Sequence, residues 1–161
     1  MAKQNKAINA LKQLALKALK QKHPKVPEHA LPNPKYSDRS SNGLTKCIVD
    51  WINLNGFQAE RINSMGRRID NRETNIDAMG FSRTIGSLQW IKSAGQVGTA
   101  DISATIKGRA VKIEVKCAAT GDKYQSQKQK EYQQHIENAG GTYIIARTFE
   151  QFYQWYKEFI K

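Results

Sequence analysis

A pair of alternating segments around Lys107-Gly108 constrains the fold of this chain more than any other feature of its sequence. Apolar and polar residues alternate through residues 102–106 and again through residues 111–115. Alternation with a period of two is typical of strands that bury one face. A short turn containing glycine between two such runs predicts a β-hairpin. The residues that define its apolar face are Ile102, Ala104, Ile106, Val111, Ile113 and Val115.

The same pattern selects the register of the hairpin. With a two-residue turn, Ile106 faces Arg109, and counting back along both strands places Asp101 opposite Glu114. A longer turn would point the apolar side chains of one strand away from those of the other, because a shift of one residue moves a side chain to the opposite face. We therefore expect the two carboxylates on one face, with their Cβ atoms roughly 5 Å apart.

Adjacent carboxylates repel each other unless a positive charge lies between them. Lys116 lies on the same strand face as Glu114 and is one candidate for that charge. Mg²⁺ or Mn²⁺ is a better one, since such a cation binds carboxylate oxygens and keeps water ligands. These groups would suit the hydrolysis of a phosphodiester bond, in which the metal acidifies a bound water and the ammonium stabilises developing charge. The alternative is an ordinary solvent-exposed face of an antiparallel sheet.

The remainder of the chain predicts an α/β domain over residues 39–161. Glycine, serine and threonine stand where helices would begin or end. In chain order the expected elements are a helix over 44–55 ended by Gly56, a strand over 57–62, short strands in loops over 63–98, the hairpin, a polar helix from Ser126 to Gly140-Gly141, a strand over 142–147 and a final helix capped by Thr148.

Positive charge exceeds negative charge by a wide margin, with 26 Lys and Arg against 14 Asp and Glu and a net charge of +12. Such a surplus attracts polyanions, because each neutralised phosphate releases counterions. We expect nucleic acid as the partner, with an anionic membrane surface as the second option. Arginines in and beside residues 63–98 suit phosphate contacts, although a solvated loop surface would carry them equally well. The candidates are Arg61, Arg67, Arg68 and Arg72.

Residues 1–38 form a segment of different composition, with eight lysines and two acids. An amphipathic helix is expected over residues 3–22, followed by a stiff linker that holds all four prolines between Pro24 and Pro34. The helix could grip DNA or dock a protein partner. Alternatively, it packs its apolar half on its own domain or on a second copy of the chain.

Cysteine usage and hydropathy suggest where the chain works. Cys47 and Cys117 are far apart in the sequence and fit no metal-ligand spacing. We expect them to be reduced, buried thiols in a cytoplasmic protein. No apolar run approaches the ~18 residues that a membrane span needs, so no membrane segment is expected.

Four short motifs follow one another, and as a set they resemble the PD-(D/E)XK nuclease superfamily. They are Gly98-Thr99-Ala100-Asp101, Ile113-Glu114-Val115-Lys116, Ser126-x-x-Gln129, and Gly140-Gly141 before an apolar strand. The closest likeness is to the virus-type replication-repair nuclease (VRR-NUC) branch, related to Holliday-junction resolvases, and it covers about residues 95–155. It implies a restriction-endonuclease-like core, with a mixed central sheet flanked by helices. Residues 1–38, the expected N-terminal helical extension, lie outside the resemblance.

The resemblance also implies an activity and roles for individual residues. The activity would be metal-dependent endonuclease cleavage of DNA, including branched DNA, in replication, recombination or repair of a phage or mobile element, in the cytoplasm of a bacterial host. Asp101 and Glu114 match the metal-binding acids, Lys116 the catalytic lysine, and Gln129 the glutamine on the following helix. A resolvase would act as a homodimer.

Two points in this assignment stay open. Ser126-x-x-Gln129 is also a capping box, in which Gln129 serves the start of its own helix, and the two roles of Gln129 would compete. Many superfamily members carry a further Glu in the first helix, which this chain lacks. Asn42 could supply a neutral oxygen ligand instead, or the chain is a catalytically inactive DNA-binding module that retains the nuclease fold. Lys123, just before the Ser126 helix, is expected to touch a bound strand.

Overall fold

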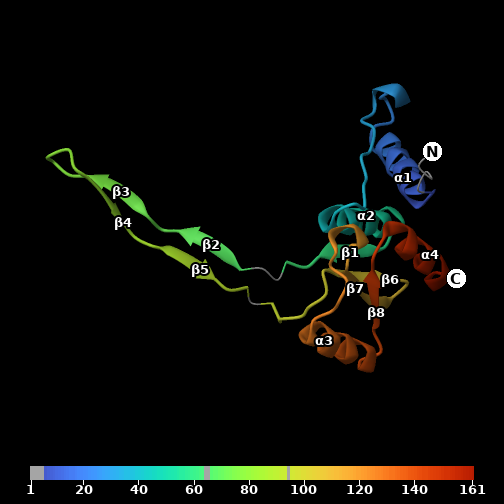
Figure 1. Ribbon diagram of the computed structural model, residues 1–161. Helices are drawn as coiled ribbons and strands as arrows, with labels where there is room; N and C mark the ends of the chain where they lie inside the picture. Colours follow the sequence, from blue (N-terminus) through green and yellow to red (C-terminus); the bar gives the residue numbers. More distant parts are fainter. Residues whose placement is uncertain (1–5, 64–65, 94) are drawn as a thin grey trace. The chain divides into compact units, whose positions relative to one another are not determined.

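The computed structural model describes residues 6–63, 66–93 and 95–161 (Figure 1). By their internal contacts these residues form two compact units. Residues up to Ile62 and from Gly98 onward make the first unit, and residues 63–97 make the second.

The first unit is built on a mixed four-stranded sheet with the strand order β1-β6-β7-β8. β6 is antiparallel to both β1 and β7, whereas β8 runs parallel to β7. The prediction of an α/β fold with a mixed sheet is therefore confirmed. The strands are β1 (Gln58–Arg61), β6 (Ile102–Ile106), β7 (Arg109–Val115) and β8 (Thr142–Ala146).

The β6–β7 hairpin has the predicted register. Ile106 pairs with Arg109 and Ala104 with Val111. Both turn residues have positive φ, 50° at Lys107 and 74° at Gly108, as a two-residue turn of type I′ requires. Its apolar face is buried, because Ile102, Ile106, Val111 and Ile113 are each 0% exposed, and Ala104 and Val115 are 4% exposed.

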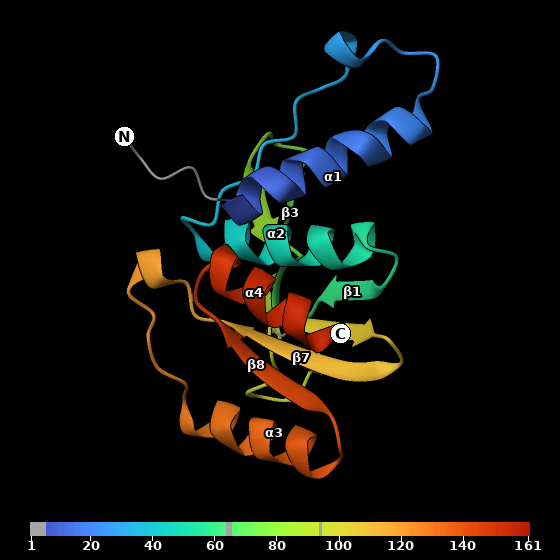
Figure 2. The same ribbon diagram turned by 90° about the vertical axis from the view of Figure 1, so that its right-hand side faces the viewer.

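Helices cover both faces of this sheet (Figure 2). α2 (Ser41–Leu54) and α4 (Phe149–Phe159) lie on the apolar face, and α3 (Gln127–Asn138) lies on the other. Trp51 of α2 makes edge contacts with the rings of Phe149, Tyr153 and Tyr156 of α4, so an aromatic cluster joins the two helices above the sheet. α3 has no fully buried residue among those described.

The N-terminal helix α1 (Lys6–Lys22) packs on α2 and α4. Ala7, Ile8, Leu11 and Ala15 are buried there, and the backbone N–H of Ala7 donates to the Glu150 carboxylate. Of the alternatives for its apolar half, the structure shows packing on its own domain. α1 thus belongs to the same compact unit as the sheet. A short 3₁₀ helix, η1 (Glu28–Ala30), lies in the proline-rich segment that follows.

The second unit consists of short strands, as expected for residues 63–98. They pair as two antiparallel ladders, β2 with β5 and β3 with β4. Which strand pairs with which was not predicted. The strands are β2 (Arg67–Asp70), β3 (Glu73–Ile76), β4 (Ser82–Ile85) and β5 (Leu88–Ile91).

The cysteines and the helices bear on two expectations drawn from the sequence. Cys47 and Cys117 are free and buried, as predicted. No helix in the described ranges has the length and apolar character to cross a membrane.

Candidate functional site

Asp101 lies immediately before β6 and is held against β7. Its Oδ2 accepts a hydrogen bond of 2.9 Å from the backbone N–H of Val115. The ladder ends at the pair Ile102–Ile113, so the next position along both strands sets Asp101 across from Glu114. The two acids therefore come together as the hairpin register predicts.

The glycine of the first motif has a steric role next to this acid. Gly98 has φ of +88°, and a Cβ added there would lie 2.6 Å from the carbonyl oxygen of Lys128 in the first turn of α3. Only glycine combines that backbone conformation with so close an approach. Gly98 thus lets the segment before Asp101 pass against the start of α3, where Gln129 lies.

Glu114 is a buried carboxylate, with only 3% of its surface exposed. Burial raises its pKa to about 7, and the negative charge of Asp101 contributes in the same direction, whereas Lys116 opposes both. A carboxyl group with a pKa this high is uncommon outside functional sites. Both causes, desolvation and a neighbouring negative charge, disfavour the ionised form of a carboxyl group.

Among the residues that the structure describes, three have side chains in contact with the carboxylate of Glu114. Gln129 of α3 donates from Nε2 to Oε1, and Lys116 Nζ lies 3.5 Å from the same oxygen. The hydroxyl of Tyr143, on β8, lies 3.5 Å from Oε2. Sequence reasoning missed Tyr143, because it stands in an apolar strand whose parallel register with β7 has no signal in the sequence.

Lys116 is also buried, at 7% exposure, and lies between two acids. Its Nζ also lies 3.1 Å from Asp122 Oδ2. Asp122 was not among the predicted site residues, since it stands in the irregular segment after β7 with no motif around it. The ammonium is thus held in place by a buried and a half-exposed carboxylate.

Gln129 makes both the capping contact and a contact with Glu114, which were expected to compete. Its side-chain Oε1 accepts from the backbone N–H of Ser126 at 2.8 Å, while the Ser126 hydroxyl accepts from the backbone N–H of Gln129. This is a complete capping box. The other end of the amide, Nε2, donates to Glu114. Competition was the wrong expectation, because an amide has an acceptor and a donor that can serve two partners at once.

Asn42 is not brought to the two acids by any hydrogen bond. It is exposed on the first turn of α2, and within the described ranges its side chain makes no hydrogen bond with Asp101 or Glu114. The only acid of that helix, Asp50, is engaged elsewhere. It accepts from the Tyr36 hydroxyl at 2.9 Å and pairs with Lys46.

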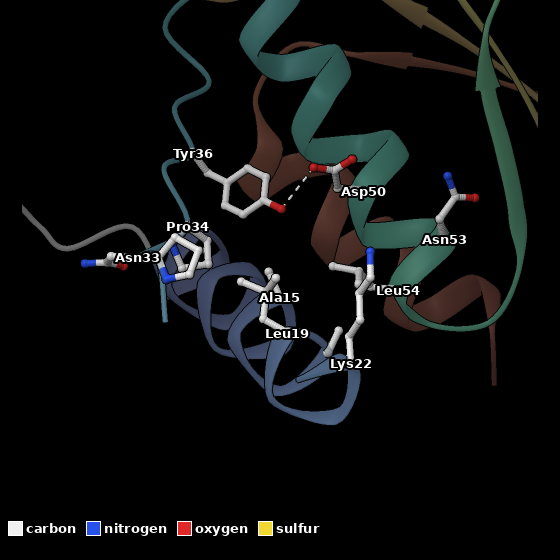
Figure 3. Close-up of a pocket in the computed structure, with 11 residues that line it drawn as sticks. Ala15, Leu19, Lys22, Asn33, Pro34, Tyr36, Asp50, Asn53 and Leu54 are labelled. Atoms are coloured by element: carbon white, nitrogen blue, oxygen red, sulfur yellow. Dashed lines mark hydrogen bonds between the residues drawn. The ribbon is translucent and has the colours of Figure 1, made fainter. Parts of the chain in front are cut away.

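Asp50 and Tyr36 line a separate pocket of about 480 Å³ between α1, the proline-rich segment and α2 (Figure 3). Its other walls are mostly apolar, with Leu19 and Leu54 among them. None of the predicted catalytic residues lines it. This pocket is therefore separate from the candidate site.

The predicted nucleic-acid-binding residues are distributed over both units. Arg61 is exposed on β1 in the first unit, and Lys123 is exposed after β7, where its carbonyl accepts from Arg147. Arg67 and Arg68 are on β2 in the second unit. Arg72, just after β2, makes a two-pronged contact with Asp70 at 2.8 Å, so part of its charge is already neutralised.

The chemistry of the donor set fits a divalent metal. Asp101 and Glu114 offer carboxylate oxygens, which Mg²⁺ and Mn²⁺ prefer. Among the residues that the structure describes, no group of three or more His, Cys, Asp and Glu side chains is arranged to hold a metal. A metal at this place would therefore be bound by two carboxylates and complete its coordination with water and substrate oxygens.

Comparisons with known proteins identify no relative of this chain. No protein-family model matches the chain, and neither does any curated protein or any solved structure. The functional argument therefore rests on the residues and geometry described above.

Proposed function

We propose that this chain is a metal-dependent DNA endonuclease with a restriction-endonuclease-like core. The observation that carries the proposal is the buried Glu114 carboxylate, set across from Asp101 and contacted by Lys116 and Gln129. These are the four residues that the resemblance to PD-(D/E)XK nucleases assigns to the active site. A mixed sheet with helices on both faces, as seen here, is also the kind of core that the resemblance implies.

Asp101 and Glu114 would hold Mg²⁺ or Mn²⁺, which when bound polarises a phosphoryl oxygen and acidifies a water. The residues of the chain supply the rest. Lys116 offers an ammonium to the charge that develops on the phosphate. Gln129 fixes the orientation of the Glu114 carboxylate. The net charge of +12 favours association with a polyanionic substrate.

The proposal is tested by incubating the purified protein with branched, single-stranded and duplex DNA, with and without Mg²⁺. We expect Mg²⁺-dependent cleavage of at least one substrate. Glu114→Ala and Lys116→Ala should each reduce the rate on the order of 10²-fold or more, as losses of groups that stabilise a transition state do. Glu158→Gln, which removes an exposed carboxylate on α4, is the control for the change in charge. Cleavage that persists unchanged in both site variants would refute the assignment.

A second candidate is a catalytically inactive DNA-binding module with the same fold. It is favoured by the position of Asn42, whose side chain is exposed and, within the described part of the chain, makes no hydrogen bond with Asp101 or Glu114. A nuclease of this class that lacks the helix acid would then be one ligand short. Salt-sensitive DNA binding with no metal-dependent cleavage of any of the three substrates would support this candidate.

A further inference from the structure

The second unit is one continuous two-stranded ribbon from Arg67 to Ile91 (Figure 1). In the β2–β5 ladder Asp70 pairs with Leu88, and in the β3–β4 ladder Glu73 pairs with Ile85. Each strand advances three residues between these pairs, so the register does not change. The backbone N–H of Asn71 donates to the carbonyl of Ser87 at 3.2 Å between the two ladders.

The tip of the ribbon is an ordered turn. Asp77 N–H donates to the Phe81 carbonyl at 3.0 Å. The side chain of Asp77 accepts from the backbone N–H groups of Met79 and Phe81 at the same distance, and Gly80 has φ of +84°. The turn thus holds large apolar side chains in solvent: Met79 is 82% exposed and Phe81 65% exposed.

This ribbon has no core of its own. None of the described residues between 63 and 97 is buried, and large apolar side chains stay exposed along both strands. A two-stranded ribbon without a third strand or a covering helix is only marginally stable in water. Exposed apolar surface of this extent is typical of an interaction site. Beside the tip residues, the exposed apolar members are Ile76, Ile85, Leu88, Trp90 and Ile91.

The charges on the ribbon favour one partner. Residues 66–92 carry five basic and three acidic side chains. One basic residue, Arg72, is bound to Asp70. Arg67, Arg68 and Arg83 have no side-chain hydrogen bond or ion pair within the described part of the chain. Unpaired arginines at intervals along an extended strand pair suit a row of phosphates, because a guanidinium binds phosphate through two parallel hydrogen bonds.

We propose that the ribbon of residues 67–91 is a DNA-binding arm that lies along duplex DNA. Arg67, Arg68 and Arg83 contact phosphates, and the apolar tip contacts bases. The major groove of B-DNA admits a two-stranded ribbon, and apolar side chains there can contact the methyl group of thymine. This proposal rests on the proposed function in one respect, that the ligand is DNA. It is otherwise independent of the catalytic site, because Asp101, Glu114, Lys116 and Gln129 all lie in the first unit.

The test measures binding of the full chain to a labelled duplex by fluorescence anisotropy, in EDTA so that no cleavage occurs, across a series of salt concentrations. The arm variant is Arg67→Ala/Arg68→Ala/Arg83→Ala. The matched control is Lys35→Ala/Arg39→Ala/Lys157→Ala, which removes the same charge from exposed positions of the first unit. All six side chains are exposed, so neither variant opens the core. A third variant, Phe81→Ser, keeps the backbone hydrogen bonds of the tip.

Each lost phosphate contact makes the dependence of log K on log salt less steep by about 0.9. The arm variant, which loses three such contacts, should therefore lower the slope by about 2.7, and the control should leave it close to that of the wild type. Phe81→Ser should weaken binding severalfold at every salt concentration with the slope unchanged, because an apolar contact releases no counterions.

Equal slopes for the arm variant and the control would overturn the proposal. So would a wild-type chain that sediments as a dimer and becomes monomeric in Phe81→Ser, since the ribbon would then be an interface between copies. Neither outcome depends on cleavage. A failed nuclease assignment, by contrast, would show as absent Mg²⁺-dependent cleavage with arm-dependent binding intact.

Discussion

Replacing Glu114 by glutamine tests whether burial of the charged Glu114 carboxylate lowers the stability of the metal-free protein. The isosteric Glu114→Gln removes the charge and keeps an oxygen for Gln129 or Lys116 to donate to. The new amide N–H₂ would face the Tyr143 hydroxyl, which now lies 3.5 Å from Oε2 and can accept. The variant should therefore fold, and its effect should be electrostatic.

The sign and size follow from the pKa of Glu114, which burial raises from 4.5 to about 7. Between these values the folded chain holds a proton that the unfolded chain releases. The stability of the wild type therefore falls as pH rises through this window and stays reduced above pH 7. At 1.36 kcal/mol per unit, the loss between about pH 5 and about pH 8 is roughly 2–3 kcal/mol.

The assay is urea unfolding in EDTA near pH 5 and near pH 8, for the wild type, Glu114→Gln and the exposed control Glu158→Gln. The difference in free energy of unfolding between Glu114→Gln and the wild type should shift by about 2–3 kcal/mol in favour of Glu114→Gln as pH rises, while the control follows the wild type. If Glu114→Gln and the wild type lose stability in parallel over this range, Glu114 is not strained by burial and this part of the account is wrong.

Further predictions separate positioning from stability. Ser126→Ala should cost about 1 kcal/mol of stability through the lost cap and keep most cleavage activity, whereas Gln129→Ala should lose both stability and activity. Unfolding curves and cleavage rates are measured on the same preparations, and similar activities of the two variants would contradict a role for Gln129 at Glu114. Asp122→Asn should lower kcat severalfold and leave DNA affinity in EDTA unchanged, because it loosens Lys116; an unchanged kcat would exclude a positioning role. Leu11→Ala should destabilise the chain by about 2–5 kcal/mol in urea unfolding, because Leu11 is 0% exposed; a loss below about 1 kcal/mol would show that α1 is not part of the core.

The central hairpin could be predicted from the sequence because its information is local. Apolar alternation fixed which side chains share a face, and Lys107-Gly108 allowed only a short turn. Together they gave the pairing of Ala104 with Val111 that the structure shows. The helix boundaries at Ser126 and Thr148 were equally local, since both depend on a side chain that caps the residues directly after it.

The contacts that complete the site could not be predicted, because they depend on distant parts of the chain. Tyr143 reaches Glu114 only through the parallel pairing of β8 with β7, and Asp122 reaches Lys116 from an irregular segment. The ribbon was missed for a related reason. Its strands are short and mixed in polarity. The sequence therefore indicates that strands form there, but not which strands pair, and the pairing of Arg67 with Ile91 could not be predicted.

The most direct test of the central claim is a crystal soaked with Mn²⁺ and measured at the manganese absorption edge. The account predicts an anomalous peak bound by the carboxylates of Asp101 and Glu114, without Asn42, and its loss in Glu114→Gln. Mn²⁺ bound elsewhere in a chain that cleaves DNA, or a soaked crystal of the active protein with no peak between these two acids, would contradict the account.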